Sequence, residues 1–248
     1  MDPLVSLITI CKNSQATIQR TIESVAAQSY ENIQYIIIDA VSTDRTLEII
    51  ETFRPHFGAR LIVISEPDEG VYDAMNKGIR NSSGEIIGII NSDDWYETNS
   101  LQLIVEAYRL NSGGVYYGFL RCYSGGDEVM VKSVSPKYLH TEHVGHPAYF
   151  VSRLLYERLG MFNVHYRFAS DYELMLRFIK NEVPFYQINH IVANYSFGGL
   201  SSRQEKYTYE EYYKIRHAYG YLSKKGLWMR IIRNRLYFML RDLPLLRK

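Results

Sequence analysis

The chain has few cysteines and no long apolar run. Cys11 and Cys122 are the only two cysteines among 248 residues, which is too few for a disulfide framework and lacks the spacing of a zinc site. No window approaches the roughly 18 consecutive apolar residues that a membrane-spanning helix needs. The N-terminus also has no basic segment and no cleavage-like site, so a signal peptide is not indicated. We therefore expect a cytoplasmic protein that is soluble or peripheral at a membrane.

Glycine-rich phosphate-binding motifs are missing as well. The sequence contains neither Gly-x-Gly-x-x-Gly nor Gly-x-x-x-x-Gly-Lys-Ser/Thr, which argues against a dinucleotide or a triphosphate held by a glycine-rich loop. The charge of a phosphorylated ligand would then need another partner. A carboxylate-bound Mg²⁺ or Mn²⁺ would provide one.

Basic residues are scarce outside the C-terminus. The formal net charge is +1, but residues 222–248 contain eight of the 28 basic and one of the 27 acidic side chains. The first 221 residues therefore hold 20 basic and 26 acidic side chains, a net charge of −6. A general nucleic-acid-binding surface is not expected from this distribution.

Strand and helix patterns alternate through the first 110 residues, and no internal repeat is present. This alternation predicts an α/β fold with a Rossmann-like, mostly parallel sheet and helices on both faces. We expect strands over residues 4–10, 35–38, 61–64 and 86–90, separated by helices that end near Gln28, Phe53 and Asn81.

The pattern changes after about residue 111. Two strand-like runs, 115–123 and 129–134, flank the turn Ser124–Asp127 and predict a hairpin, so the parallel sheet should continue into a mixed sheet. Further expected elements are helices over residues 152–159 and from residue 170, a strand over residues 183–195 that Pro184 would place at an edge, and a helical C-terminal extension.

Acidic residues follow several of the expected strands. Asp39 follows the second strand, the loop 66–70 follows the third, and Asp93 and Asp94 follow the fourth. Ligands of open α/β sheets bind outside the carboxyl ends of the strands, so these acids indicate a site. Two adjacent acids in an extended turn point in different directions, which would allow one to hold a hydroxyl and the other a metal ion. The alternative is that Asp93 and Asp94 only cap the following helix.

Five short motifs, in order along residues 4–178, resemble those of family 2 glycosyltransferases with the GT-A fold. Each is weak alone, but their order is specific. They are Val5–Thr9 with Asn13, Ile36–Ala40 with Ser42–Asp44 and Thr46, Asp68–Gly78, Asn91–Trp95, and Ser170–Glu173 with Arg177.

The resemblance implies a nucleotide-sugar donor site in residues 1–110. By position, Asp39 would accept a hydrogen bond from the donor base, and Thr9 would lie in the loop along the nucleoside. Asp68 and Asn76 would line the base pocket, although they could instead be a turn former and a helix-surface residue. Val41 stands where the family usually has a small residue.

The same resemblance gives separate tasks to the two adjacent acids. Asp93 would bind the ribose, and Asp94 would ligate the Mg²⁺ or Mn²⁺ that bridges the diphosphate. The expected donor is a nucleoside-diphosphate sugar, with UDP preferred over GDP or dTDP. Residues 1–200 would form the catalytic domain, with the acceptor part in 111–200, and residues 201–248 a helical extension with a basic amphipathic tail.

The reaction implied by the resemblance is inverting transfer to a saccharide acceptor, free or lipid-linked, in surface polysaccharide biosynthesis. Asp171 matches the family's catalytic base, which removes the proton of the attacking hydroxyl; on position alone it could be an N-cap. Processive synthases of the family carry transmembrane helices and a Gln-x-x-Arg-Trp motif. This chain has neither, so we expect addition of a single sugar. A sugar nucleotidyltransferase and a non-catalytic binding module of the same fold are the alternatives.

Three histidines, His140, His143 and His146, recur every three residues. This spacing in a loop does not match a zinc site, because no second group of ligands completes it. His146 matches a histidine common in the family and could contact the acceptor or the diphosphate, or it could be a buried, hydrogen-bonded histidine.

The C-terminal segment 223–248 combines basic and apolar residues. On a helical wheel Arg230, Arg233, Asn234 and Arg241 share one face and most apolar residues the other, although Arg235 falls within the apolar arc. This pattern predicts either a helix at a membrane surface or a helix docked on the catalytic domain or on a partner subunit.

Overall fold

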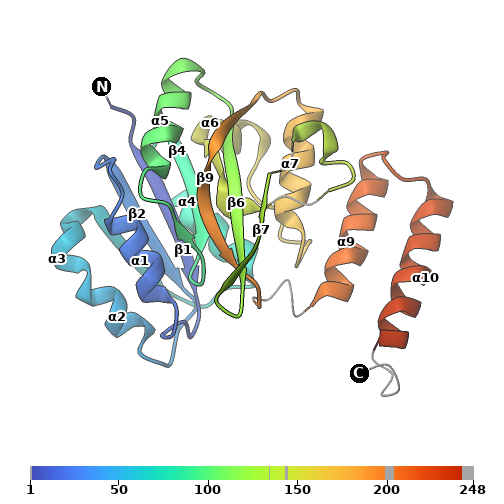
Figure 1. Ribbon diagram of the computed structural model, residues 1–248, viewed down its shortest axis with the longest axis horizontal. Helices are drawn as coiled ribbons and strands as arrows, with labels where there is room; N and C mark the ends of the chain where they lie inside the picture. The colour runs from blue at the N-terminus through green and yellow to red at the C-terminus, as the bar shows by residue number, and fades with distance from the viewer. Residues whose placement is uncertain (1, 134, 143–144, 199–203, 242–248) are drawn as a thin grey trace.

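Four parallel strands form the first half of a nine-stranded sheet in the computed structural model, which describes residues 2–133, 135–142, 145–198 and 204–241 (Figure 1). In sheet order the strands are β3 (Leu61–Ser65), β2 (Ile33–Asp39), β1 (Val5–Cys11) and β4 (Ile86–Asn91). Almost all residues of β1, β2 and β4 are buried, as expected for strands covered on both faces, whereas in the edge strand β3 only Leu61 is buried. The carboxyl ends of the four strands are aligned, because Asp39 pairs with both Cys11 and Ser65, and Ile10 pairs with Asn91.

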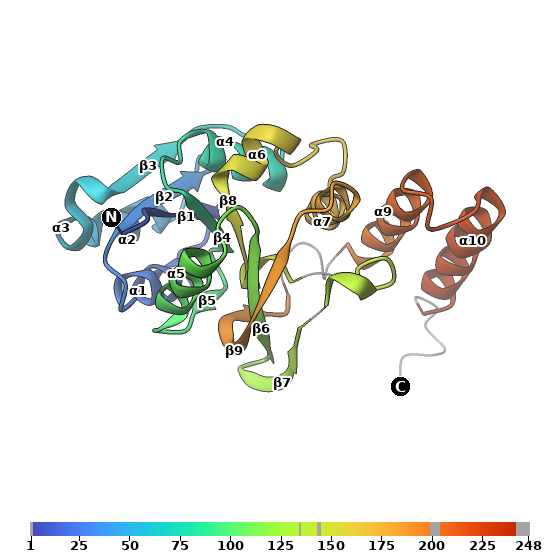
Figure 2. The ribbon, with the colours of Figure 1, turned by 90° about the horizontal axis from the view of Figure 1, so that it is seen from above.

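Helices cover both faces of these strands, as expected from the sequence. Figure 2 shows α1 (Ile18–Ala26) and α5 (Ser100–Leu110) on one face, and α4 (Val71–Arg80) and α6 (Arg153–Leu159) on the other. The short elements that lead into β3 are α2 (Thr46–Thr52), α3 (Arg54–Phe57) and the 3₁₀ turn η1 (Gly58–Arg60).

The second half of the sheet is mixed, which confirms the change of pattern expected after residue 111. The predicted hairpin is present as β6 (Val115–Ser124) and β7 (Asp127–Lys132). Three more strands complete the sheet. β8 (Tyr149–Ser152) lies between β4 and β6 and is antiparallel to both. β9 (Phe185–Ser196) is parallel to β6 and antiparallel to the short β5 (Trp95–Tyr96).

The prediction that residues 183–195 form an edge strand is wrong for the end of β9. Pro184 lies before the strand, where its carbonyl accepts a hydrogen bond from the Val115 N–H at 3.0 Å. Ala193 and Asn194 pair with β5 on the side away from β6, so this part of β9 is internal. The proline therefore begins the strand without removing any ladder hydrogen bond.

The remaining helices lie beyond the sheet. α7 (Ser170–Lys180) follows the short turns η2 (Pro136–Tyr138) and η3 (His146–Ala148) in the chain. α9 (Glu205–Ala218) buries Tyr212 and Ile215 in the main core, and α10 (Lys224–Arg241) is the outermost element in both views (Figures 1 and 2). Within the described ranges, no helix combines the length and apolar character needed to cross a membrane.

Candidate active site

Hydrogen bonds join the loops that follow β1, β2 and β4. The Asn13 N–H donates to Ser42 Oγ at 2.8 Å, and the Thr43 N–H donates back to Asn13 Oδ1 at 2.8 Å. The Ser14 hydroxyl lies 2.8 Å from that of Ser92, in the loop after β4. Each loop is therefore positioned by its neighbours, and the three loops together form a preorganised surface at the carboxyl ends of the strands.

Asp39 is at the centre of this arrangement and is fully buried. Its carboxylate accepts hydrogen bonds from the Ser42 N–H at 2.9 Å, from Ser65 Oγ at 2.6 Å and from the Ser42 hydroxyl, with the Cys11 thiol at 3.6 Å. A carboxylate has about four acceptor positions, and all of them are used here. The structure thus gives Asp39 a loop-organising role, and the predicted hydrogen bond to a donor base would require one of these groups to move.

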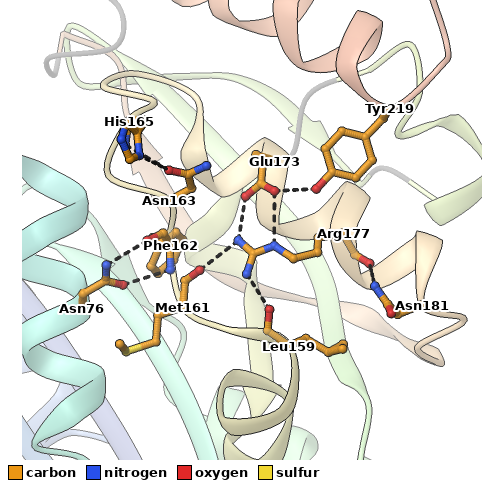
Figure 3. Close-up of polar contacts among 10 residues, drawn as sticks. All are labelled: Asn76, Leu159, Met161, Phe162, Asn163, His165, Glu173, Arg177, Asn181 and Tyr219. Carbon is orange, nitrogen blue, oxygen red and sulfur yellow. Dashed lines mark hydrogen bonds and ion pairs between the residues drawn. The ribbon is translucent and has the colours of Figure 1, made fainter.

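Two of the predicted donor-binding residues point into the protein interior. Thr9 lies within β1, not in a loop, and its hydroxyl is 3.0 Å from the Tyr35 hydroxyl in the core. Asn76 exchanges two 2.9 Å hydrogen bonds with the backbone of Phe162 and is neither in a pocket nor on the helix surface (Figure 3). The structure therefore gives no support to the predicted donor contacts, because both side chains are engaged within the protein.

Two other residues of the predicted donor site do lie in loops. Asp68 is half-buried and accepts a hydrogen bond from the Gly70 N–H at 2.9 Å, which is the turn-forming arrangement. Val41 is about half exposed and has a φ of 55°, in the left-handed region. A β-branched residue in this region is a true outlier, and such strain often marks a functional loop.

The adjacent acids Asp93 and Asp94 have different surroundings. Asp94 is fully buried, and its two oxygens accept hydrogen bonds from the Ser196 N–H at 2.9 Å and from Asn91 Nδ2 at 3.4 Å. Burial raises the pKa of Asp94 well above its usual value, and the charge of Asp93 adds to this effect. Asp93 is only half-buried. Neither acid caps the next helix, because Asn99 holds the N-cap position of α5.

Arg20 is a basic residue of this site that the sequence analysis missed. Its guanidinium donates to the backbone carbonyl of Asp93 at 2.8 Å and to Ser196 Oγ at 3.2 Å. It also lies 3.6 Å from the ring centroid of Trp95, which is a cation–π contact. Nothing in the helix pattern distinguishes Arg20 from an ordinary exposed residue of α1, so only the structure reveals it.

The loop that contains Asp93 and Asp94 could hold a divalent cation only together with further ligands from a bound substrate. In the described ranges no group of three or more His, Cys, Asp or Glu side chains could hold a metal ion. Mg²⁺ is commonly held by one or two carboxylates together with substrate phosphates and waters, and Asp93 meets that requirement. Among the described side chains none donates to its carboxylate, whereas Asp94 is fully buried and its two oxygens already accept hydrogen bonds from the Ser196 N–H and Asn91 Nδ2.

Asp171 lies in the first turn of α7. Its Oδ1 accepts a hydrogen bond from the Tyr72 hydroxyl at 2.9 Å, and its Oδ2 is 3.9 Å from His146 Nδ1. Burial raises the pKa of Tyr72 well above its usual value, and the charge of Asp171 adds to this, so Tyr72 stays protonated and donates. The N-cap alternative is wrong, because Ala169 occupies that position.

His146 and Asp171 line the same small cavity, together with Tyr156 and Phe162. Its volume of about 20 Å³ has room for one water molecule. Burial lowers the pKa of His146 although Asp171 opposes this, so the imidazole is neutral at pH 7. Its Nε2 is buried and has no hydrogen-bond partner among the described residues. The alternative of a buried, hydrogen-bonded histidine is therefore not supported at Nε2.

Of the other two histidines of the recurring pattern, only His140 is described by the structure. The ring of His140 packs on Tyr221, with 5.7 Å between the centroids. His143 lies outside the described residues.

Figure 3 shows how α7 is anchored. Arg177 pairs with Glu173 at 2.6 Å and donates to the carbonyls of Leu159 and Met161 at 2.7 and 2.9 Å. The hydroxyl of Tyr219, the residue that follows α9, donates to Glu173 at 2.5 Å. The helix that carries Asp171 is therefore fixed from two sides.

α9 also contacts the segment that precedes α7 in the chain. The Glu211 carboxylate accepts hydrogen bonds from three consecutive backbone N–H groups, those of Arg167, Phe168 and Ala169, at 2.8 to 3.0 Å. These residues lead into the first turn of α7, where Asp171 is located. No sequence motif marked Glu211, because a Tyr-rich helical segment gives no indication of what its acids contact.

Known glycosyltransferases are similar to this chain in sequence. A glycosyltransferase of PGL/p-HBAD biosynthesis from Mycobacterium bovis (strain BCG / Pasteur 1173P2) is 29% identical over 213 residues, covering 81% of this chain and 80% of that protein. A glycosyltransferase of Mycobacterium tuberculosis (strain ATCC 25618 / H37Rv) is 32% identical over 189 residues, covering 71% of this chain and 68% of that protein.

Solved structures give the same fold. S. aureus TarS 1–349 in complex with UDP superimposes with a TM-score of 0.71 at 16% identity, covering 94% of this chain and 70% of that one. The complex of TarS 1–349 with UDP-GlcNAc gives a TM-score of 0.70 at 16% identity, covering 96% and 74%. The expected GT-A fold is confirmed. The model of the family described as "Glycosyl transferase family 2" matches residues 6–195. The chain is a glycosyltransferase and belongs to this family.

Proposed function

We propose that this glycosyltransferase is inverting and metal-dependent, and that it adds one sugar at a time to a saccharide acceptor in surface polysaccharide biosynthesis. The observation that carries the proposal is the position of Asp171. Its carboxylate lies at a helix N-terminus, one oxygen is held by Tyr72, and it lines a cavity beside a neutral His146. This environment suits a general base, because the hydrogen bond from Tyr72 fixes the orientation of the carboxylate beside the cavity.

In the proposed reaction the acceptor hydroxyl attacks the anomeric carbon from the face opposite the nucleoside diphosphate. Asp171 takes the hydroxyl proton as the new glycosidic bond forms and the bond to the diphosphate breaks. Positioned general bases typically contribute about 10²- to 10⁴-fold to the rate. The unpartnered Nε2 of His146 supports a hydrogen bond to the acceptor or to the diphosphate.

On the donor side we propose that Asp93, not Asp94, ligates the cation, because Asp93 is the more exposed acid. This reverses the division of tasks implied by the resemblance, in which Asp93 binds the ribose. When bound, Mg²⁺ or Mn²⁺ would neutralise charge on the leaving diphosphate. Asp94 would hold the Asp93 loop against the end of β9 through the Ser196 N–H, and Arg20 would support the same loop from α1.

The proposed donor is a UDP-sugar, with GDP- and dTDP-sugars as further candidates. The support is the fold shared with TarS, which has been solved with UDP and with UDP-GlcNAc. The free, buried thiols of Cys11 and Cys122 support a reducing, cytoplasmic location. The family match leaves no support for a nucleotidyltransferase or a non-catalytic module.

The test is release of nucleoside diphosphate from a panel of UDP-, GDP- and dTDP-sugars, with and without Mn²⁺. Wild-type protein should turn over one donor in a metal-dependent reaction, and the product should have the opposite anomeric configuration by NMR. Asp171→Asn should lower kcat by about 10²-fold or more while the donor still binds. Full activity of Asp171→Asn, or full activity without metal, would refute the corresponding part of the proposal.

A further inference from the structure

α10 has two separate apolar faces. One packs on α9 through Ile231 and Phe238, with Asn234 between them donating to the Lys206 carbonyl at 2.9 Å. The other face points away from α9 and is between 49% and 59% exposed. We call it the outer stripe; its residues are Trp228, Met229, Ile232, Leu236, Met239 and Leu240.

Arg235 marks a boundary between these faces. Its guanidinium pairs with Glu210 of α9 at 2.8 Å, while its side chain is largely exposed. On a wheel of 100° per residue it falls between the α9-facing residues and the outer stripe. Its place within the apolar arc is therefore explained, because that arc consists of two faces with different partners.

The charge on α10 is of one sign. Lys224–Arg241 contains six basic and no acidic residues. Arg235 and Arg241 pair with Glu210 and Glu205 of α9. The other four, Lys224, Lys225, Arg230 and Arg233, form no ion pair with any described residue. A surface that complements α10 must therefore be apolar along the stripe and anionic beside it.

We infer that the outer stripe of α10 docks on an anionic lipid bilayer, with the helix lying in the plane of the surface. The stripe would enter the boundary between headgroups and acyl chains, and the four cations without an ion pair among the described residues would contact the headgroups. One of them, Arg230, lies over the Tyr213 ring of α9, 5.8 Å from its centroid. A second copy of the chain fits less well, because pairing two outer stripes would bring two basic helices together without any acid. The acidic body of the protein would be repelled by such a surface, so only the α10 side can approach it.

Co-sedimentation of the full chain with vesicles tests this inference directly. Vesicles of phosphatidylcholine with phosphatidylglycerol should bind the protein, and vesicles of phosphatidylcholine alone should bind it much more weakly. Replacing both Ile232 and Leu236 by serine should lower the partition coefficient by roughly tenfold or more. The matched control replaces the exposed Leu110 and Leu154, on α5 and α6, by serine and should bind as the wild type does.

Two further measurements identify the surface in contact. Arg230→Gln and Arg233→Gln should each weaken binding to anionic vesicles by about fivefold. The only tryptophans are Trp95 and Trp228, so quenching by brominated lipid should disappear in Trp228→Phe. Binding that is insensitive to the Ile232 and Leu236 replacements would overturn the inference. So would a dimer, seen by light scattering, that these replacements dissociate.

Discussion

At the scale of single residues, the site contains two fully buried carboxylates with unequal support. Asp39 receives hydrogen bonds from hydroxyl and backbone groups of two neighbouring loops. Asp94 receives one backbone N–H and one longer contact from Asn91, and it has no cation in direct contact among the described residues. Asn91 Oδ1 is itself buried without a partner. Burial of the Asp94 carboxylate therefore lowers the stability of the folded protein.

We predict that Asp94→Asn stabilises the metal-free protein at pH 7. The folded-state pKa of Asp94 is raised by burial, so the folded protein binds the proton more tightly than the unfolded chain does. Wild-type stability must then fall as the pH rises from the unfolded pKa through the raised one. Asn has no such penalty, keeps an acceptor for the Ser196 N–H, and can donate to Asn91 Oδ1 if that amide rotates.

Thermal unfolding in the presence of a chelator, between pH 4 and pH 8, measures this effect. The difference in Tm between Asp94→Asn and the wild type should grow with pH, at about 2–4 °C for each kcal/mol. Asp93→Asn is the control with a half-buried acid and should show a smaller pH dependence. A Tm difference that does not change with pH would contradict the prediction.

Val41 offers a second test at this scale. A left-handed conformation costs a non-glycine residue roughly 1–2 kcal/mol. Part of this is offset in Val41→Gly by the greater freedom of the unfolded chain, so the free energy of unfolding should rise by about 0.5–1 kcal/mol. Urea denaturation measures the change. Val41→Ala keeps a Cβ and should gain clearly less; an equal gain would mean that branching, not the positive φ, is responsible.

At the scale of elements, the motifs located the strands well. Expected strands 4–10, 61–64 and 86–90 agree with β1, β3 and β4 within one residue. Long runs of Ile and Val identify buried parallel strands without any alignment. The two-residue β5 and the four-residue β8 were missed, because runs this short have no periodicity to detect.

The same motifs located the site less completely. Asp171, His146 and Asp93 do lie in loops or at a helix start that face the cavity or solvent. Thr9 and Asn76 do not, because a motif gives the position of a residue and not the direction of its side chain. In a strand that direction alternates at each residue, and in a helix it rotates by about 100°, so a buried and a ligand-facing position can be neighbours.

α9 is the element whose contribution the sequence could not indicate. We predict that Glu211→Ala lowers kcat by about tenfold or more while the donor KM stays within about twofold, because the three N–H groups before α7 lose their acceptor and Asp171 is displaced. Steady-state kinetics with both substrates measures the split. The free energy of unfolding should also fall by about 1–3 kcal/mol.

The next residue in the chain provides the matched control. Glu210→Gln weakens only the ion pair with Arg235 of α10 and should leave kcat unchanged. Glu211→Gln keeps a hydrogen-bond acceptor and should restore part of the activity. Equal effects of Glu210→Gln and Glu211→Ala on kcat would show that α9 acts only through overall stability.

At the scale of the whole molecule, the C-terminal extension consists of two helices with different attachments. α9 contributes Tyr212 and Ile215 to the main core, whereas α10 contacts α9 and buries only Ile231, Asn234 and Phe238. We therefore expect the functional boundary of the catalytic unit to fall after α9, near residue 222, and not near residue 200.

Truncation tests this boundary. A chain ending at residue 222 should unfold cooperatively and keep its kcat on a water-soluble acceptor. A chain ending at residue 204 should lose both properties, because Ile215 and the Glu211 contacts are removed. Product formation and thermal unfolding measure the two outcomes. Loss of activity in the longer chain would show that α10 belongs to the catalytic unit.

The neighbouring carboxylates Glu210 and Glu211 have a practical consequence for protein engineering. Glu211 of α9 accepts hydrogen bonds from the segment before α7, and Glu210 pairs with Arg235 of α10. Support of the catalytic part and attachment of α10 therefore depend on adjacent but separate side chains. α10 could be replaced by another localisation segment, for example a tag that recruits the enzyme to a synthetic scaffold, with Glu210 substituted and Glu211 kept. Relocating the enzyme would then not require any redesign of its chemistry.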